Sequence, residues 1–388
     1  MNLIDSIRYL LIVIIFQSNI CNIHSINIEN KNKKSEITNG DIVVGANQIS
    51  RYIDYINKKN IGIVANHTSV IFKKDNSYTH LVDSLLSLNI KISKIFTPEH
   101  GYKGENYNGE NVSDRVDQNT GLKIISLHGK NREYGKILDN DLIDIELMIF
   151  DIQDVGARFY THISTLHYVM EACARNNIPL LVFDRPNPNG SYIDGPVLEN
   201  ENKSFVGMHP VPIVYGMTIG EYAQMINGES WLNNKLKCNL KIIKLLNYKH
   251  DSSYSLLINP SPNLPNDRSI FLYPSLCLFE GTNVSVGRGT TNQFQIIGSP
   301  YLDQKIYSFK FTPKPNQGSK YPPHNNEKCY GLDLRNNLLE RKLSLNYIID
   351  AYKNTTNKTE FFNDYFIKLS GTKDLKNQII NNTSEDVI

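Results

Sequence analysis

The apolar and polar positions along the chain predict a series of short buried strands, each followed at once by a polar loop. Short apolar runs occupy residues 61–65, 92–96, 124–127, 147–150, 178–183 and 240–246. Between these runs, residues 81–88 and about 164–176 predict helices. In the second helix, Leu166, Val169 and Cys173 recur at helical spacings. Strands alternating with helices predict a parallel sheet wrapped by helices.

The clearest strand-helix-strand unit runs from Leu147 to Gly190. Its first strand ends in an acidic and amide-rich turn, and the loop continues to the predicted helix. In open α/β sheets, ligands bind in the crevice beyond the carboxyl ends of the strands. We therefore expect a site near the polar side chains of this loop, which are Asp151, Gln153, Asp154, Arg158 and Tyr160.

The pattern changes after Gly190, where the chain becomes irregular and rich in proline. Thr218 and Glu221 are spaced as a capping box, which predicts a helix from there to about Asn227. A length of 388 residues favours two domains. We predict an α/β fold with a Rossmann-like parallel-sheet domain over residues 39–230 and a second, smaller α/β domain over residues 231–388.

The N-terminus has the pattern of an export signal. Arg8 precedes an apolar run from Tyr9 to Phe16 that is short for a membrane span. We interpret residues 1–38 as a signal peptide with a flexible leader, which predicts a secreted or periplasmic protein. Lipidation of Cys21 is the alternative, although Asn19 and Ile20 are poor residues before such a cysteine. Contact with a membrane is expected only through this segment.

Composition and motifs exclude several classes of function. The 41 Lys and Arg against 39 Asp and Glu give a net charge of +2 without a basic stripe, so nucleic acid is not an expected partner. No glycine-rich phosphate motif is present, so no nucleotide is expected. His67, His100 and His128 follow neighbouring strands, but their spacings match no metal motif. We expect no metal and no cofactor.

Two glutamates are the best candidates for acid–base chemistry. Glu99 follows a strand and a proline, where a partly desolvated carboxyl group can act as a general acid. Glu280 precedes a glycine-rich loop that carries Arg288, which can bind a carboxylate in bidentate fashion. The plain alternatives are a capping or ion-paired Glu99, and a surface turn with an internal pair between Glu280 and Arg288.

The order of the motifs resembles one family. The blocks, which cover about residues 60 to 305, are IVANHTSV, FTPEHGYKGE, FDIQDVGARFYTHISTLHYVMEA, VFDRPNPNG, GPVLE, YGMTIGEYA, PSPNLPND, LYPSLCLFEGTNVSVGRGTT and FQIIGSPYL. They look like the successive blocks of the NamZ-type exo-β-N-acetylmuramidases, bacterial glycoside hydrolases. The resemblance implies an active site in the cleft between two domains.

The resemblance also implies a reaction and its residues. It implies release of terminal, non-reducing β-1,4-linked N-acetylmuramic acid (MurNAc) from peptidoglycan-derived oligosaccharides such as MurNAc-GlcNAc, in which GlcNAc is N-acetylglucosamine. Glu99 would be the catalytic acid and Glu280 the second carboxylate, a role that Asp151 or Asp154 could take instead. The residues that would bind the sugar are Asn66, His100, Asp151, Gln153, Asp154, Arg158, Tyr160, Asn283 and Arg288.

The chain departs from the family pattern in two places. His67 stands where the family usually has proline, which would alter the pocket rim. The family also continues past the point that matches Ser384 to Ile388, so the resemblance implies a shortened C-terminal domain. A muropeptide- or glycan-binding protein without activity is therefore an alternative function, and a muramyl esterase or amidase is a third.

Overall fold

The computed structural model describes residues 41–99, 101–102, 113–128, 135–338 and 340–388. Residues Ile42 to Ile388 form one compact unit. The predicted signal peptide and leader (1–38) and His100 lie outside the described residues. No helix in the described ranges is long and apolar enough to cross a bilayer.

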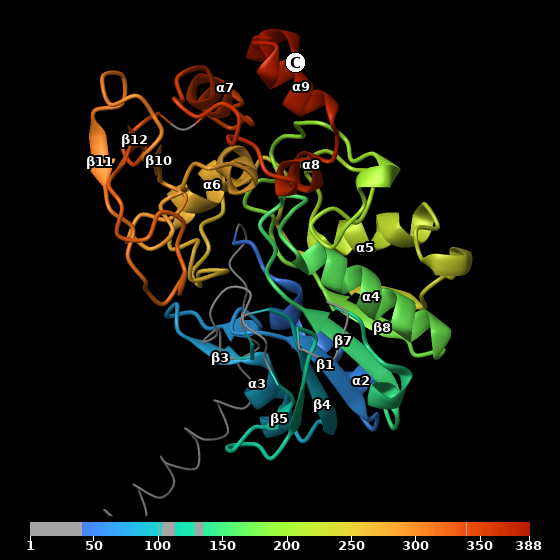
Figure 1. Cartoon of the computed structure of the whole chain (residues 1–388). Coiled ribbons are helices and arrows are strands. Elements are labelled where there is room, and N and C mark those ends of the chain that lie inside the picture. Colours follow the sequence, from blue (N-terminus) through green and yellow to red (C-terminus); the bar gives the residue numbers. More distant parts are fainter. Residues whose placement is uncertain (1–40, 100, 103–112, 129–134, 339) are drawn as a thin grey trace, which may run out of the picture. The chain divides into compact units, whose positions relative to one another are not determined.

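A seven-stranded sheet in the order β5-β6-β4-β1-β7-β8-β9 forms the centre of the first part of the chain (Figure 1). Every neighbouring pair is parallel except β5 and β6. The strands are β1 (Ile61–Ala65), β4 (Ile92–Thr97), β5 (Arg115–Val116), β6 (Lys123–Ser126), β7 (Leu147–Asp151), β8 (Leu180–Phe183) and β9 (Leu240–Ile243). The chain crosses from one half of the sheet to the other between β6 and β7, which is the arrangement of a doubly wound fold. The predicted fold class is confirmed.

Helices bury both faces of this sheet. Alternate strand residues such as Phe150 and Val182 pack toward α4 (His162–Arg175), which lies beside β7 and β8 in Figure 1, and share one apolar cluster with α5 (Ile219–Gly228). The intervening residues, Ile149 among them, pack with α2 (Ile53–Ile56) and α3 (Leu81–Ser87) on the other face. Side chains of successive strand residues point to opposite faces, so two covered faces require the unbroken apolar runs seen in the sequence.

Most of the predicted elements are confirmed. The helix at α5 begins with the predicted capping box, in which the Thr218 side chain accepts from the Glu221 amide and the Glu221 carboxylate accepts from the Thr218 amide. The short hairpin of β2 (Val70–Phe72) and β3 (Tyr78–His80) was not predicted. β9 belongs to the large sheet, so that sheet extends past the predicted boundary at residue 230. The boundary itself stays a prediction.

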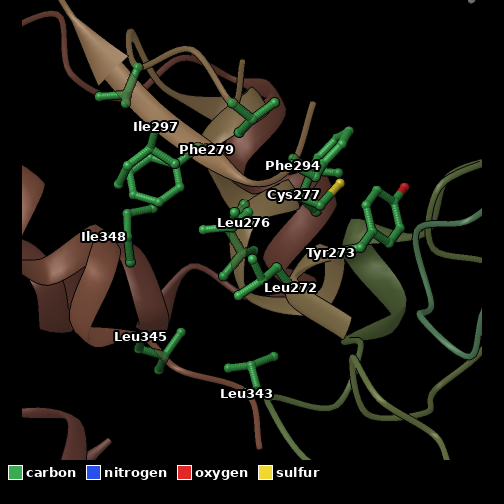
Figure 2. Close-up of a cluster of buried hydrophobic side chains, with 14 of the residues drawn as sticks. Leu272, Tyr273, Leu276, Cys277, Phe279, Phe294, Ile297, Leu343, Leu345 and Ile348 are labelled. Atoms are coloured by element: carbon green, nitrogen blue, oxygen red, sulfur yellow. The ribbon is translucent and has the colours of Figure 1, made fainter. Parts of the chain in front are cut away.

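The rest of the chain packs around a second apolar cluster (Figure 2). An antiparallel sheet in the order β10-β12-β11 contributes Ile297, and α6 contributes Leu272 and Leu276. The elements are α6 (Asp267–Leu276), the 3-10 helix η6 (Cys277–Gly281), β10 (Ile296–Ser299), β11 (Phe309–Phe311), β12 (Cys329–Asp333), α7 (Asn346–Lys353), α8 (Tyr365–Ser370) and α9 (Asp374–Ile380). The cluster also includes Phe159 and Tyr160, which follow β7, so the two parts share buried contacts.

A buried ion pair joins the ends of β7 and β8. Arg185 donates from Nε to Asp151 Oδ1 at 2.6 Å and from its terminal nitrogen to Asp151 Oδ2 at 2.8 Å. The same terminal nitrogen donates to the carbonyl of Val70 at 3.0 Å. Both side chains are almost fully buried, at 2% and 0% exposed. Asp151, predicted to bind substrate, accepts from a bidentate arginine with both of its carboxylate oxygens.

The neighbouring polar residues after β7 also have protein partners. Gln153 donates to the carbonyls of Asp154 and Pro186, and its backbone amide donates to Thr68 in the loop after β1. In that loop, Asn66 accepts from the amide and hydroxyl of Thr68. Asp154 is 6% exposed and accepts hydrogen bonds from the Gly156 amide and the Tyr215 hydroxyl. These contacts hold the loop after β7 in place.

Arg158 is a structural residue in this fold. Its side chain is fully buried, and the guanidinium donates to the carbonyls of Pro196, Val211, Leu369 and Ser370 at 2.7–3.0 Å. The last two carbonyls belong to the C-terminal end of α8. The arginine predicted to bind substrate therefore ties α8 to the loop after β7.

Burial raises the pKa of Asp154 to about 6, although hydrogen bonds from Tyr215 and Gly156 act in the opposite direction. A carboxyl group with a raised folded-state pKa stabilises the fold below its unfolded-state pKa and loses that contribution as pH rises through about 6. We therefore expect the free energy of unfolding of wild type, relative to Asp154→Asn, to fall by up to about 3 kcal/mol between pH 4 and 7. Denaturant unfolding at several pH values measures this difference. Parallel pH profiles for the two proteins would contradict it, and the exposed Asp251→Asn is the matched control.

Candidate active site

A cavity of about 440 Å³ lies at the carboxyl edge of the large sheet and reaches the second cluster. Glu99 follows β4, His128 follows β6, and residues 159–162 join β7 to α4. The far side is formed by residues around Glu280 and by α8. Segments distant in sequence therefore meet around one space, and its volume is in the range of small-molecule sites.

Glu99 is placed at the wall of this cavity by the end of β4. The strand is buried up to Thr97, and Glu99 itself is half-buried in the turn that follows. Burial and then the carboxylates of Asp154 and Glu99 raise the pKa of Tyr160. Glu99 also contributes, with Glu280, to the raised pKa of Tyr365, in which burial is again the largest cause. The carboxyl groups of Glu99 and Glu280 therefore both raise the pKa of the same side chain, Tyr365.

Glu280 and Arg288 form an ion pair at the cavity. Arg288 Nε donates to Glu280 Oε1, and the side chains are 14% and 21% exposed. Burial would lower the pKa of Arg288, but the Glu280 carboxylate outweighs it and raises that pKa. The guanidinium lies over the ring of Phe294, at 5.3 Å from its centre. One terminal nitrogen of Arg288 is buried without a partner in the described part of the chain.

Aromatic side chains form another part of the wall. The Tyr160 hydroxyl donates to the Pro260 carbonyl at 2.9 Å, so its ring is fixed. The rings of His162 and Tyr273 pack against it edge to face, with centres 4.7 and 5.9 Å away. Rigid rings of this kind suit the apolar faces of a sugar, because they offer contact area without mobile side chains.

The helix α8 supplies two lining residues that sequence reasoning missed. Tyr365 and the exposed Lys368 both face the cavity. No motif surrounds them, and α8 lies far along the chain from the predicted site. Only the buried Arg158, which binds the carbonyls at the end of α8, reveals why this helix is held there. His128 and His162 also line the cavity.

The predicted site residues divide into two groups. Glu99, Tyr160, Glu280 and Arg288 line the cavity together. The residues that do not line it are Asn66, Asp151, Gln153, Asp154, Arg158 and Asn283. Asn283 is held through its backbone, where its amide donates to the Phe361 carbonyl at 2.8 Å and its carbonyl contacts His324 at 2.8 Å. Sequence position near a strand end did not reveal which way each side chain points.

The cavity combines opposite charges in a form suited to acid–base chemistry on a polar ligand. Among the described residues, its charged lining side chains are two carboxylates, Glu99 and Glu280, and two cations, Arg288 and Lys368. Within the described ranges no group of His, Cys, Asp and Glu is arranged to hold a metal ion. The buried His167 and His209 contact each other at 2.9 Å between α4 and the loop before α5, away from the cavity.

Comparison with known proteins gives consistent matches over the chain. Residues 61–268 match the family model described as exo-beta-N-acetylmuramidase NamZ, N-terminal, and residues 271–388 match its C-terminal counterpart. The peptidoglycan beta-N-acetylmuramidase NamZ of Bacillus subtilis (strain 168) is 36% identical over 357 residues, covering 87% of this chain and 84% of that protein.

Two crystal structures of Bacteroides fragilis proteins, both described as DUF1343 family members, share the fold. The first is 41% identical with a TM-score of 0.81 and covers 90% of this chain and 93% of that chain. The second is 27% identical with a TM-score of 0.73 and covers 89% and 93%.

Proposed function

Because the chain belongs to the NamZ family of exo-β-N-acetylmuramidases, we propose that its cavity hydrolyses the terminal β-N-acetylmuramyl bond of peptidoglycan fragments. The observation that carries the proposal is the meeting of Glu99 with the Glu280–Arg288 pair in one cavity. Glycoside hydrolysis uses two carboxyl groups on either side of the scissile bond. Among the residues that the structure describes, no other acidic side chain lines this cavity.

The two glutamates suit different roles. Glu99 is the acid that protonates the leaving-group oxygen, since it stands on the wall formed by the sheet edge. Glu280 is held in place by Arg288, which donates from Nε to its Oε1. A fixed carboxylate stabilises the oxocarbenium-like transition state or activates the attacking water. Asp151 and Asp154 are less suited to this role, because both are buried outside the cavity lining.

The charge of the cavity matches a muramyl sugar. When Glu99 carries the proton that it donates, the described lining has one carboxylate, Glu280, and two cations, Arg288 and Lys368, so its net charge is +1. The lactyl group that distinguishes MurNAc from GlcNAc carries one negative charge. Lys368 has no hydrogen-bond or ion-pair partner in the described part of the chain, so we assign the lactyl carboxylate to it.

The physiological setting follows from the substrate class. Peptidoglycan-derived MurNAc-GlcNAc oligosaccharides are the proposed substrates, and turnover or salvage of the cell wall is the proposed role. A secreted or periplasmic location, predicted from residues 1–38, belongs to the same proposal. A glycan-binding protein without activity would release no product from the same substrate, and an esterase or amidase would leave its glycosidic bond intact.

Glu99→Gln is expected to lower kcat for release of MurNAc from MurNAc-GlcNAc by about a thousandfold or more, because an amide cannot donate the proton. Binding of the disaccharide, measured by calorimetry, should change little. The exposed Glu229→Gln, at the end of α5, is the matched control and should retain wild-type activity. Undiminished release by Glu99→Gln would remove Glu99 as the acid.

Lys368→Gln is expected to raise KM for a β-MurNAc glycoside about threefold to fivefold with little change in kcat, since an exposed ion pair contributes at most about 1 kcal/mol. The effect should shrink at high ionic strength. KM for the matching β-GlcNAc glycoside should not change. Lys353→Gln, on an exposed position of α7, is the control. An equal rise in KM for both glycosides would exclude Lys368 as the lactyl contact.

A further inference from the structure

A second cavity, of about 640 Å³, lies beside the proposed catalytic cavity. Ser261 lines both. In contrast to the first cavity, its described lining contains no Asp, Glu, Lys or Arg. Amide and hydroxyl side chains line it together with two rings and several apolar residues, as the members His67, Tyr78, Leu257, Asn259, Pro262, Thr291, Gln293 and Gln317 illustrate. Its lining therefore suits an uncharged ligand that has both polar and apolar faces.

The same two segments separate the cavities. Within residues 257–265, Asn259 faces the second cavity, whereas Leu264 faces the first. Within residues 288–294, Gln293 lines the second cavity and the next residue, Phe294, lines the first. The Arg288 guanidinium lies over the ring of Phe294. A ligand that extends out of the catalytic cavity along this wall therefore meets the second one.

Gln293 has the properties of a ligand-binding side chain. It is only 7% exposed, yet its amide forms no hydrogen bond with any described residue. Gly318 also lines the second cavity, and it lies close to the Gln293 amide, since a Cβ added at Gly318 would be 3.4 Å from Gln293 Nε2. The amide is therefore at the cavity wall. The amide atoms are not among the buried polar atoms without a partner, so they are open to the cavity. A bound polar group can therefore form hydrogen bonds with them.

The second cavity lies on the side of the proposed acid. β1 and β4 are neighbours in the sheet, and the loops after them carry His67 and Glu99. His67 lines the second cavity and Glu99 the first. The His67 ring contacts the Asn259 carbonyl at 2.8 Å, which closes this side of the wall. Since Glu99 protonates the oxygen of the leaving group, the leaving group is directed toward the second cavity.

We propose that the second cavity binds the neutral N-acetylhexosamine that leaves when the muramyl bond is cleaved, with Gln293 as a hydrogen-bonding contact. This inference rests on the proposed function. The half-exposed Tyr78 ring offers a surface for the apolar face of that sugar. The lack of charged lining residues fits GlcNAc, which carries no carboxylate, and contrasts with the charged cavity that takes MurNAc.

The test compares two leaving groups. Gln293→Ala should lower kcat/KM for MurNAc-GlcNAc about five- to tenfold, which corresponds to the loss of about one hydrogen bond. For an aryl β-MurNAc glycoside, which has no leaving sugar, kcat/KM should stay within about twofold of wild type. Tyr78→Ala, at an exposed position, should give the same selective loss if Gln293→Ala fails to fold. Gln224→Ala, on the exposed side of α5, is the matched control.

Equal losses for both substrates, or no loss for either, would overturn the assignment of the second cavity. Failure of the proposed function has a different signature, because wild type would then release MurNAc from neither substrate.

Discussion

The parallel order of the large sheet is the constraint on which the site depends. It brings the loops after β4, β6 and β7 to one edge, where Glu99, His128 and Tyr160 line a single cavity. The buried pair of Asp151 and Arg185 locks this edge by joining β7 to β8 and to the backbone after β1. Loss of one partner would leave an uncompensated buried charge, which typically costs about 3–5 kcal/mol.

A second set of buried polar contacts fixes the opposite wall. Arg158 has no carboxylate partner in the described chain and binds four carbonyls instead. Two of these carbonyls end α8, so the position of Tyr365 and Lys368 at the cavity follows from an arginine after β7. The residues of the loop after β7 thus act on the site by holding its walls, while the chemistry is assigned to Glu99 and Glu280.

The sequence predicted the frame of the fold, but it did not reveal the direction in which individual side chains point. Unbroken apolar runs identified the buried strands, and the spacing of Thr218 and Glu221 located the start of α5. Glu99, Glu280 and Arg288 were found from motifs and do line one cavity. Asp151 and Arg158 were expected to bind substrate, but a position after a strand does not reveal whether a side chain turns inward.

Contacts between segments that are distant in the sequence could not be predicted, for a similar reason. No motif surrounds Lys368, which gains its place only when distant segments pack together, and Gln293 falls between two motif blocks without belonging to either. The family was nevertheless predicted from the order of the motifs, and the matches over residues 61–268 and 271–388 confirm it.

Cleavage of a MurNAc-GlcNAc oligosaccharide in ¹⁸O-labelled water, followed by mass analysis, tests the central claim most directly. The account predicts free MurNAc released from the non-reducing end, with the label in its C1 hydroxyl and none in the remaining saccharide. Label in a newly formed carboxylic acid, or an intact oligosaccharide that remains bound, would contradict hydrolysis of the muramyl bond.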